Sequence, residues 1–177
     1  DGVFIEADVD DYARLEAKYK SVPRIRTLQS FVTPQNVLDL FRSADVPKDL
    51  ELLAIDIDGG DYWVWRALTD YVPRIVVIEY NPELPADERL VVPSDYSGWD
   101  GSDYFGASIG ALAALGDSKG YRLVHTDLTG ANAFFVRRDL PGDWPDEPEL
   151  RGPNSFLLGM RHPADMLDRP FDRDPPV

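Results

Sequence analysis

Short apolar runs alternate along the first half of the chain with segments of helical period. Three apolar runs, at 3–6, 52–58 and 75–80, are nearly uninterrupted and end in acidic or polar residues. Strands of this kind are typical of parallel sheets that are covered on both faces. Between them, the segments 9–20 and 61–70 repeat apolar residues every three or four positions, which indicates amphipathic helices. The alternation predicts an open α/β sheet with right-handed crossovers.

Local start and stop signals refine these elements. Asp8 is a predicted N-cap for the helix over 9–20, which has acids in its first turns and lysines near its end, as the helix dipole favours. A further strand is expected over 25–31. Thr33 and Pro34 then predict the N-cap and first position of a short helix.

The second half of the chain has a different pattern. A helix is expected over 107–115, and the runs 120–125 and 133–137 are close enough to form an antiparallel hairpin. Eight of the fifteen prolines follow residue 138. We therefore divide the chain into an α/β domain, 1–138, and a proline- and aspartate-rich extension, 139–177, that wraps the surface or frays.

The segment 81–104 has no sustained period and contains Tyr96, Trp99 and Tyr104. Ordered loops of this length often serve as lids or binding loops. The other interpretation is a surface loop whose aromatic side chains pack on the core. The sequence leaves both open.

Charge and composition limit the function. The 177 residues include 18 Lys and Arg against 32 Asp and Glu, a net charge of −14, so a nucleic-acid partner is not expected. There is no cysteine, which excludes disulfides and thiolate chemistry. No apolar run approaches the roughly 20 residues of a membrane span, and no signal peptide is visible. We expect a cytoplasmic protein that acts on a small molecule, with a homo-oligomer left open.

Acidic and amide side chains follow two neighbouring predicted strands. Asp56 and Asp58 end one strand, and Glu79 and Asn81 end the next. Ligands of open α/β sheets bind at the carboxyl edge, and oxygen ligands of this kind suit Mg²⁺, so Asp58, Glu79 and Asn81 are candidate metal ligands. The alternative is structural: Asp61 caps the next helix and Asp58 stabilises the turn.

Two further residues are candidates for chemistry. Glu6, at the end of a strand and just before a helix, is placed to accept hydrogen bonds from the hydroxyls of a ribose. His125, near the end of a strand, is a candidate general base, although a lone histidine is more often structural.

The order of these parts resembles the class I S-adenosylmethionine-dependent methyltransferases, and more closely their FkbM-like branch. The resemblance spans roughly residues 2 to 138 and implies a Rossmann-like, open, mostly parallel twisted sheet with helices on both faces and a terminal antiparallel hairpin. The segments that carry it are Gly2-Val3-Phe4-Ile5-Glu6-Ala7-Asp8, Leu53-Ala54-Ile55-Asp56-Ile57-Asp58-Gly59, Val77-Ile78-Glu79-Tyr80, Gly120-Tyr121-Arg122-Leu123-Val124 and Asn132-Ala133-Phe134-Phe135-Val136.

The resemblance implies roles for particular residues. Glu6 would bind the ribose of S-adenosyl-L-methionine, and Ser30 and Phe31 would lie beside the cofactor. Asp56 and Asp58 would line the methyl-transfer site, with Asp56 also near the cofactor. The implied reaction is methyl transfer to a hydroxyl group of a small molecule or sugar.

One departure from the family concerns its first strand and the glycine-rich loop after it, which should precede Gly2 and do not occur in this sequence. In the family that strand lies between the strands that here end in Glu6 and Asp58. We therefore expect an upstream segment to complete the sheet. The expectation fails if these two strands pair directly with each other.

Two other function classes remain open. Asp56-Ile57-Asp58-Gly59 also resembles the nucleophile motif of haloacid-dehalogenase-type phosphatases, in which Asp56 would be phosphorylated, Asp58 would be the general acid and Mg²⁺ would assist. Gly60 stands where that family has a Thr or Ser. The third class is a non-catalytic module that uses the aromatic loop around 96–104 to contact other proteins.

Overall fold

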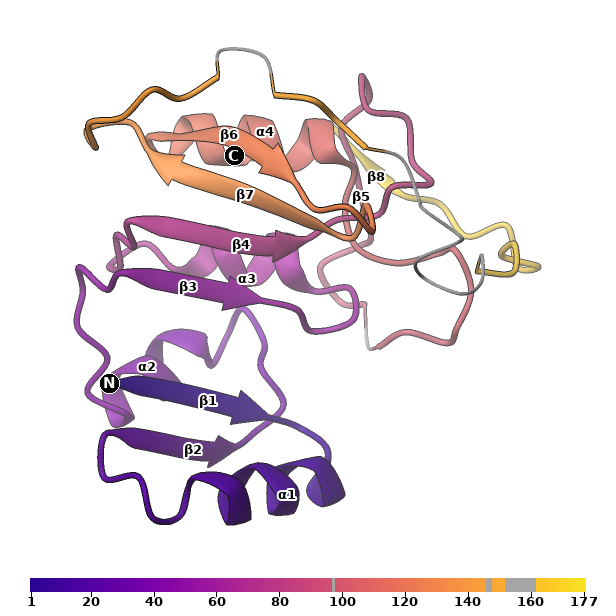
Figure 1. Ribbon diagram of the computed structural model, residues 1–177. Coiled ribbons are helices and arrows are strands. Elements are labelled where there is room, and N and C mark those ends of the chain that lie inside the picture. The colour runs from indigo at the N-terminus through magenta and orange to yellow at the C-terminus, as the bar shows by residue number, and fades with distance from the viewer. Residues whose placement is uncertain (97, 146–147, 152–161) are drawn as a thin grey trace.

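The computed structural model describes residues 1–96, 98–145, 148–151 and 162–177 (Figure 1). Within them the chain forms an α/β protein with four helices and three small sheets. The helices are α1 (Val9–Tyr19), α2 (Val37–Ser43), α3 (Asp61–Ala67) and α4 (Ile109–Ser118). The strands are β1 (Gly2–Glu6), β2 (Ile25–Gln29), β3 (Leu52–Ile55), β4 (Ile75–Glu79), β5 (Leu90–Val91), β6 (Tyr121–Thr126), β7 (Asn132–Arg137) and β8 (Asp172–Arg173).

The expected single Rossmann-like sheet is wrong. β1 and β2 pair in parallel as one sheet, while a second sheet has the order β3-β4-β7-β6, with β3 and β4 parallel and β7 antiparallel to both of its neighbours. β5 and β8 form a third, antiparallel sheet. The α/β class and the antiparallel hairpin of β6 and β7 are confirmed.

The two-stranded and four-stranded sheets are separate, since β1 and β3 do not pair with each other. Each has a hydrogen-bonded neighbour on one side only, β2 for β1 and β4 for β3. The two strands run in the same direction, and the space between them is wider than that between β3 and β4 (Figure 1). In the described residues, β1 and β3 therefore do not form the direct pair that would contradict the expected additional strand between them.

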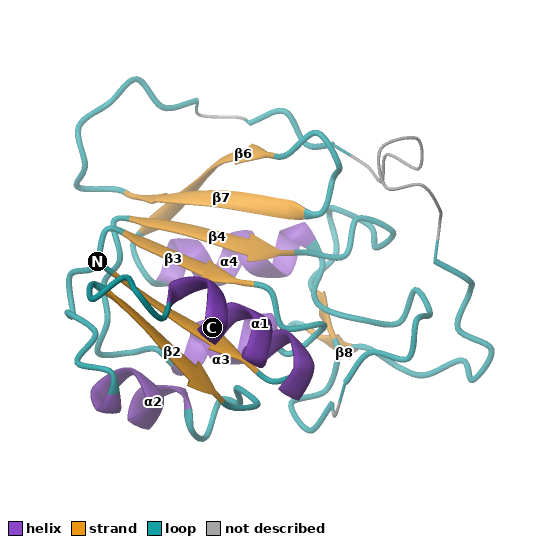
Figure 2. Ribbon diagram, turned by 60° about the horizontal axis from the view of Figure 1, so that its bottom comes forward, coloured by secondary structure: helices purple, strands orange, loops and turns teal. Residues whose placement is uncertain are grey.

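The apolar core lies on one side of the sheets. α3 and α4 cover that side of the four-stranded sheet, and Trp65, Leu112 and Phe135 are fully buried there (Figure 2). α1 lies on the opposite side and covers only β1 and β2, where Phe4 stacks on Tyr19. Helices thus occupy both sides, but unevenly.

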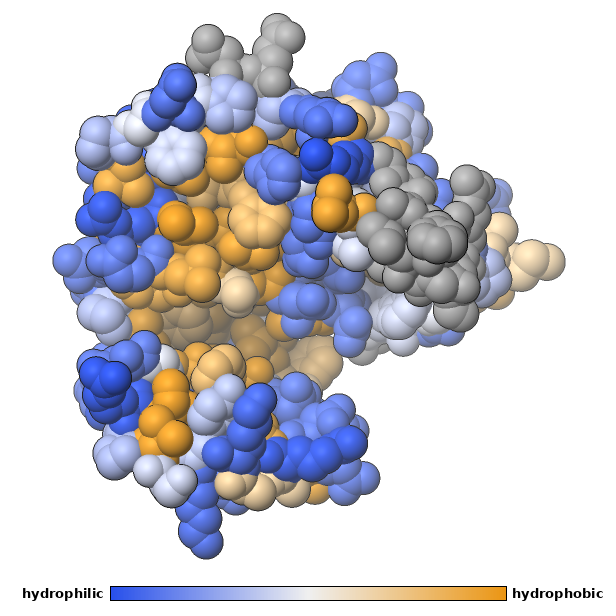
Figure 3. Space-filling view, viewed as in Figure 1, coloured by the Kyte–Doolittle hydropathy of each residue, from blue (hydrophilic) through white to orange (hydrophobic). Residues whose placement is uncertain are grey.

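The side of β3 and β4 that faces away from the core is apolar and uncovered. Leu52 is 56% exposed and its register partner Ile75 is 37% exposed. Figure 3 shows this apolar surface next to a hollow that separates it from the part of the molecule containing β1 and β2. Monomeric proteins seldom leave such a continuous apolar surface in water, so this face is suited to contact with another segment.

The predicted ends of several elements differ from the observed ones. Asp8 does cap α1, because its carboxylate accepts hydrogen bonds from the backbone N–H groups of Asp10 and Asp11, both at 2.9 Å. α2, however, begins at Val37 and not after Thr33. Thr33 and Asn36 instead exchange side-chain-to-backbone hydrogen bonds, which close a turn before the helix.

The C-terminal extension is joined to the rest of the fold. β8 pairs with β5, and the Tyr62 hydroxyl donates a hydrogen bond to the carbonyl of Pro176 at 3.1 Å. The described parts of 139–177 thus contact the rest of the fold, as expected for an extension that wraps the surface.

No helix in the described residues is long and apolar enough to cross a membrane.

Candidate functional site

A pocket of about 350 Å³ lies where the parallel strands end. Its lining comes from the residues that follow β2, the loop that follows β3, helix α3 and the loop that follows β5. The lining residues are Phe31, Val32, Thr33, Pro34, Gln35, Ile57, Asp58, Gly60, Trp63, Pro93, Ser94, Asp95, Tyr96 and Gly98. Two residues expected from the sequence, Phe31 and Asp58, therefore share one cavity with Tyr96 of the aromatic loop.

The loop after β3 is held in shape by the carboxylate of Asp61. This side chain is fully buried and accepts hydrogen bonds from the backbone N–H groups of Ile57 at 3.1 Å and Gly59 at 3.0 Å. Burial raises the pKa of Asp61 to about 7, although the two N–H groups favour its charged form. Asp61 is thus the first residue of α3 and organises the loop, which differs from the expected N-cap role.

The same loop adopts unusual backbone angles that aim Asp58 at the pocket. β3 ends at Ile55, not at Asp58 as expected, and Asp58 has a φ of 55° in the left-handed region. Gly59 follows with a φ of 126°, and a Cβ atom there would lie 2.5 Å from Cε1 of Tyr96. Only glycine fits at this position, so the loop after β3 and the aromatic loop are in close contact.

Burial and neighbouring carboxylates raise the pKa of Glu79 and Asp56 after the ends of β3 and β4. Burial raises the pKa of Glu79 to about 9, and the charges of Asp61, Asp56 and Asp58 add to the shift. Partial burial, followed by the charge of Asp58, raises the pKa of Asp56. Glu79 is therefore protonated at neutral pH and cannot serve as a carboxylate base.

Asn81, one of the predicted magnesium ligands, is occupied by hydrogen bonds within the protein. Asn81 is fully buried, and its amide nitrogen donates to the carbonyls of Asp103 and Phe105 at 2.8 and 2.9 Å. Its amide oxygen accepts from the backbone N–H of Glu83 at 3.0 Å. Among the residues that the structure describes, no three His, Asp or Glu side chains are grouped so as to hold a metal ion. Asn81 instead anchors the aromatic loop to the end of β4.

Glu6 and Ser30 lie at the adjacent ends of β1 and β2. The backbone N–H of Ser30 donates to the Glu6 carbonyl at 2.9 Å and continues the parallel pairing of the strands. The Glu6 carboxylate accepts a hydrogen bond from the backbone N–H of Asp8 at 2.8 Å, which orients it at the start of α1. Phe31 follows Ser30 and is 56% exposed at the rim of the pocket.

His125 lies apart from this group. It is on β6, opposite Phe134 of β7, so β7 and β4 separate it from the end of β3. Its ring contacts Phe134 and the guanidinium of Arg151, and it is not among the residues that line the pocket. These contacts favour the structural interpretation of this histidine.

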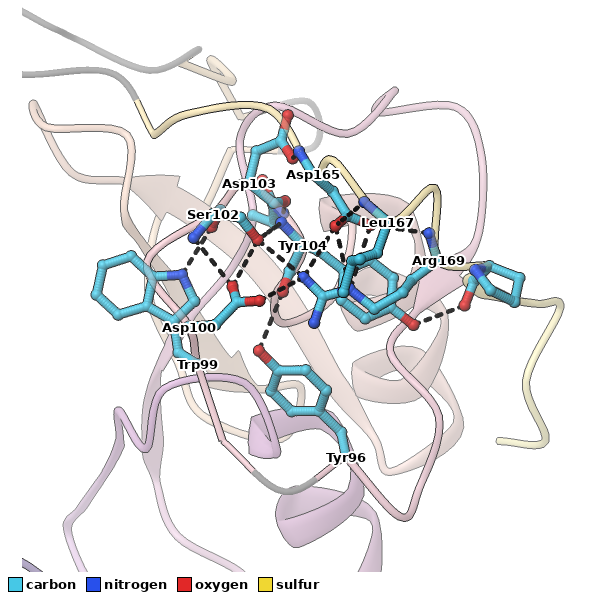
Figure 4. Close-up of polar contacts among 11 residues, drawn as sticks. Tyr96, Trp99, Asp100, Ser102, Asp103, Tyr104, Asp165, Leu167 and Arg169 are labelled. Carbon is cyan, nitrogen blue, oxygen red and sulfur yellow. Dashed lines mark hydrogen bonds and ion pairs between the residues drawn. The ribbon is translucent and has the colours of Figure 1, made fainter.

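The C-terminal extension fastens the aromatic loop (Figure 4). The guanidinium of Arg169 donates to Asp100 at 2.7 Å and Asp165 at 3.0 Å, and lies 4.3 Å from the ring centroid of Tyr104. The Tyr96 hydroxyl donates to the Tyr104 carbonyl at 3.0 Å. Tyr104 is thus buried, whereas Tyr96 lines the pocket.

No family model, curated protein or solved structure matches the chain.

Proposed function

We propose that the chain forms the body of an S-adenosylmethionine-dependent methyltransferase that methylates a hydroxyl group of a small molecule or sugar. The observation that carries the proposal is the pocket at the carboxyl edge, where the ends of two parallel strand pairs bring Phe31 and Asp58 together. Open α/β folds bind their ligands at this edge. The strand order and the acidic strand ends support the resemblance to the class I fold.

The residues present suit the cofactor chemically. The carboxylate of Glu6 is a hydrogen-bond acceptor for the two hydroxyls of a ribose, and Ser30, just after the neighbouring strand β2, lies beside Glu6. Phe31 offers an exposed ring for stacking. Asp56 would lie on the other side of the space between β1 and β3, where its negative charge suits a sulfonium.

The proposal requires one further strand, which would lie between β1 and β3. Both strands have an unpaired edge on this side and run in the same direction, so a parallel strand would satisfy both edges. It would join the two sheets into the order β2-β1-new-β3-β4-β7-β6. Its end would lie between Glu6 and Asp56, where the resemblance expects a glycine-rich loop.

The exposed apolar face supports the same addition. The chain passes from β1 through α1 to the neighbouring strand β2. If the additional strand came before β1 in the chain, the step from it to β1 would cross the sheet in the same direction as the step from β1 to β2. Because crossovers of parallel strands are right-handed, its connection would lie on the same side as α1. That is the side on which Leu52 and Ile75 are exposed, so a connecting helix would cover them.

Hydrogen exchange tests the additional strand. In the encoded protein, which by this proposal contains the additional strand, the amides of β1 (Gly2–Glu6) and β3 (Leu52–Ile55) are expected to exchange slowly. Their rates should match those of β4 (Ile75–Glu79), which has neighbours on both sides. The 177-residue chain alone should exchange about tenfold faster or more in the first two segments than in the third. Equal rates for the three segments in the isolated chain would contradict the open gap.

The protein's own groups have distinct parts in the reaction. S-adenosylmethionine, when bound, would supply an electrophilic methyl group for transfer to the acceptor oxygen, with its sulfur as the leaving group. Asp58 accepts the hydroxyl proton, because its carboxylate is in the pocket. Asp61 fixes the loop that carries Asp58, and the pocket walls align the acceptor.

Calorimetric titration with S-adenosylhomocysteine tests the function. We expect saturable heat with the encoded protein and a dissociation constant about tenfold higher in Glu6→Gln, because an uncharged amide is a weaker acceptor for ribose hydroxyls. Glu16→Gln, on the exposed side of α1, is the matched control and should bind as the wild type does.

The alternatives predict other results. Absence of heat would favour a non-catalytic module, whereas Asp56-dependent release of phosphate from an aryl phosphate with Mg²⁺ would favour the phosphatase.

A further inference from the structure

We propose that the pocket binds a methyl acceptor that carries a protonated amine on an apolar body about the size of one ring. The inference rests on the proposed methyltransferase function, since it names the substrate class of the same site. It is argued from the charge, the aromatic walls and the size of the pocket.

All the ionisable groups of the lining that carry charge at neutral pH are acidic. Asp58 and Asp95 line the pocket, and both are exposed, so their carboxylates are available to a ligand. No lysine, arginine or histidine is among the described lining residues. The arginine fastened to the adjacent loop, Arg169, is neutralised by Asp100 and Asp165. A carboxylate or phosphate on the ligand would therefore be repelled, and a cation would be attracted.

Aromatic rings supply the second element of cation recognition. Phe31 and Tyr96 line the cavity from two different segments, the residues after β2 and the loop after β5. Trp63 also lines the cavity, and its indole N–H donates to the Val92 carbonyl at 2.8 Å, which fixes the ring. The combination of ring faces with carboxylates is typical of sites for organic ammonium groups.

The size of the cavity limits the acceptor. Its volume of about 350 Å³ lies near the lower end of the range for small-molecule sites, roughly 300–1,000 Å³. Apolar side chains, among them Val32, Pro34 and Ile57, form much of the remaining wall. A single ring or short apolar chain with an amine and a hydroxyl fits these walls, and a polyanionic acceptor does not suit their charge.

Three phenols of nearly equal size test the charge preference: tyramine, a cation; 4-ethylphenol, which is neutral; and 4-hydroxyphenylacetate, an anion. Their dissociation constants would be measured by calorimetry with the encoded protein in the presence of S-adenosylhomocysteine. We expect tyramine to bind about tenfold more tightly than 4-ethylphenol, and the anion to bind most weakly. Asp95→Asn should reduce the preference for tyramine to about threefold or less, while Asp87→Asn, an exposed acid outside the pocket lining, should retain it.

The outcomes separate this inference from the function on which it rests. Binding of S-adenosylhomocysteine without any preference for tyramine, or a preference that Asp95→Asn leaves unchanged, would overturn the acceptor class and leave the methyltransferase intact. A preference for tyramine in a protein that binds no S-adenosylhomocysteine would overturn the methyltransferase function and with it the acceptor role.

Discussion

Replacement of Asp58 by asparagine is expected to lower the rate constant of methyl transfer by about 100-fold or more, since a positioned general base contributes at least that much. The amide keeps the shape and polarity of the side chain but cannot accept the hydroxyl proton. Asparagine also tolerates the left-handed backbone that Asp58 adopts, with a φ of 55°, so the loop should keep its conformation. The affinity for S-adenosylhomocysteine should change by about twofold or less.

Asp45→Asn is a matched control for this substitution. Asp45 also has a left-handed backbone, with a φ of 51°, and it follows α2 away from the pocket lining, where it pairs with Arg26. Its replacement should leave the rate unchanged. Equal rates in Asp58→Asn and the wild type, measured by single-turnover transfer of a labelled methyl group, would remove Asp58 from the mechanism.

Replacement of Glu79 by glutamine is expected to remove most of a large pH dependence of stability. Burial raises the pKa of Glu79 to about 9, so between its unfolded pKa of 4.5 and pH 9 the native state binds more protons than the unfolded state. The free energy of unfolding therefore falls as pH rises through this window. We expect Glu79 to account for a loss of about 3 kcal/mol between pH 6 and pH 9 in the wild type.

The glutamine variant should lose far less over the same range and be the more stable protein at pH 9. Urea unfolding at a series of pH values measures both slopes. Glu83→Gln, in the exposed loop that follows β4, should behave as the wild type does. A wild type whose stability is flat or increases from pH 6 to pH 9 would contradict the buried, protonated Glu79.

Local patterns were sufficient to predict most elements of the fold. The apolar runs that became β1, β3 and β4 were recognisable because apolar residues occupy both faces of each strand and polar residues mark their ends. The helical period and the Asp8 cap located α1 within one residue. These signals depend only on neighbours in the sequence, which is why they are reliable.

Long-range pairing was not predictable in the same way. β5 and β8 are two residues each and are strands only because segments more than 80 residues apart meet. The gap between β1 and β3 likewise reflects which strands are adjacent in space. α2 begins late because Thr33 and Asn36 form a turn by side-chain hydrogen bonds, which compete with a helical start.

The candidate site was predicted in part. The alternation of side chains in a strand pointed to Asp58, but the strand stops at Ile55, and Asp58 lines the pocket from a left-handed turn beyond it. The roles of Asp61, Asn81 and Arg169 depend on tertiary contacts with loops and the C-terminal extension. One signal for Asp61 was available, because a charged residue beside two glycines and an apolar helix often organises a loop.

Equilibrium dialysis of the encoded protein against labelled S-adenosylmethionine tests the central claim most directly. The account predicts one equivalent of cofactor bound per chain, displaced by S-adenosylhomocysteine and unaffected by ATP, whose phosphates the acidic edge repels. Failure to bind the cofactor even at millimolar concentration, or displacement by ATP and not by S-adenosylhomocysteine, would contradict it.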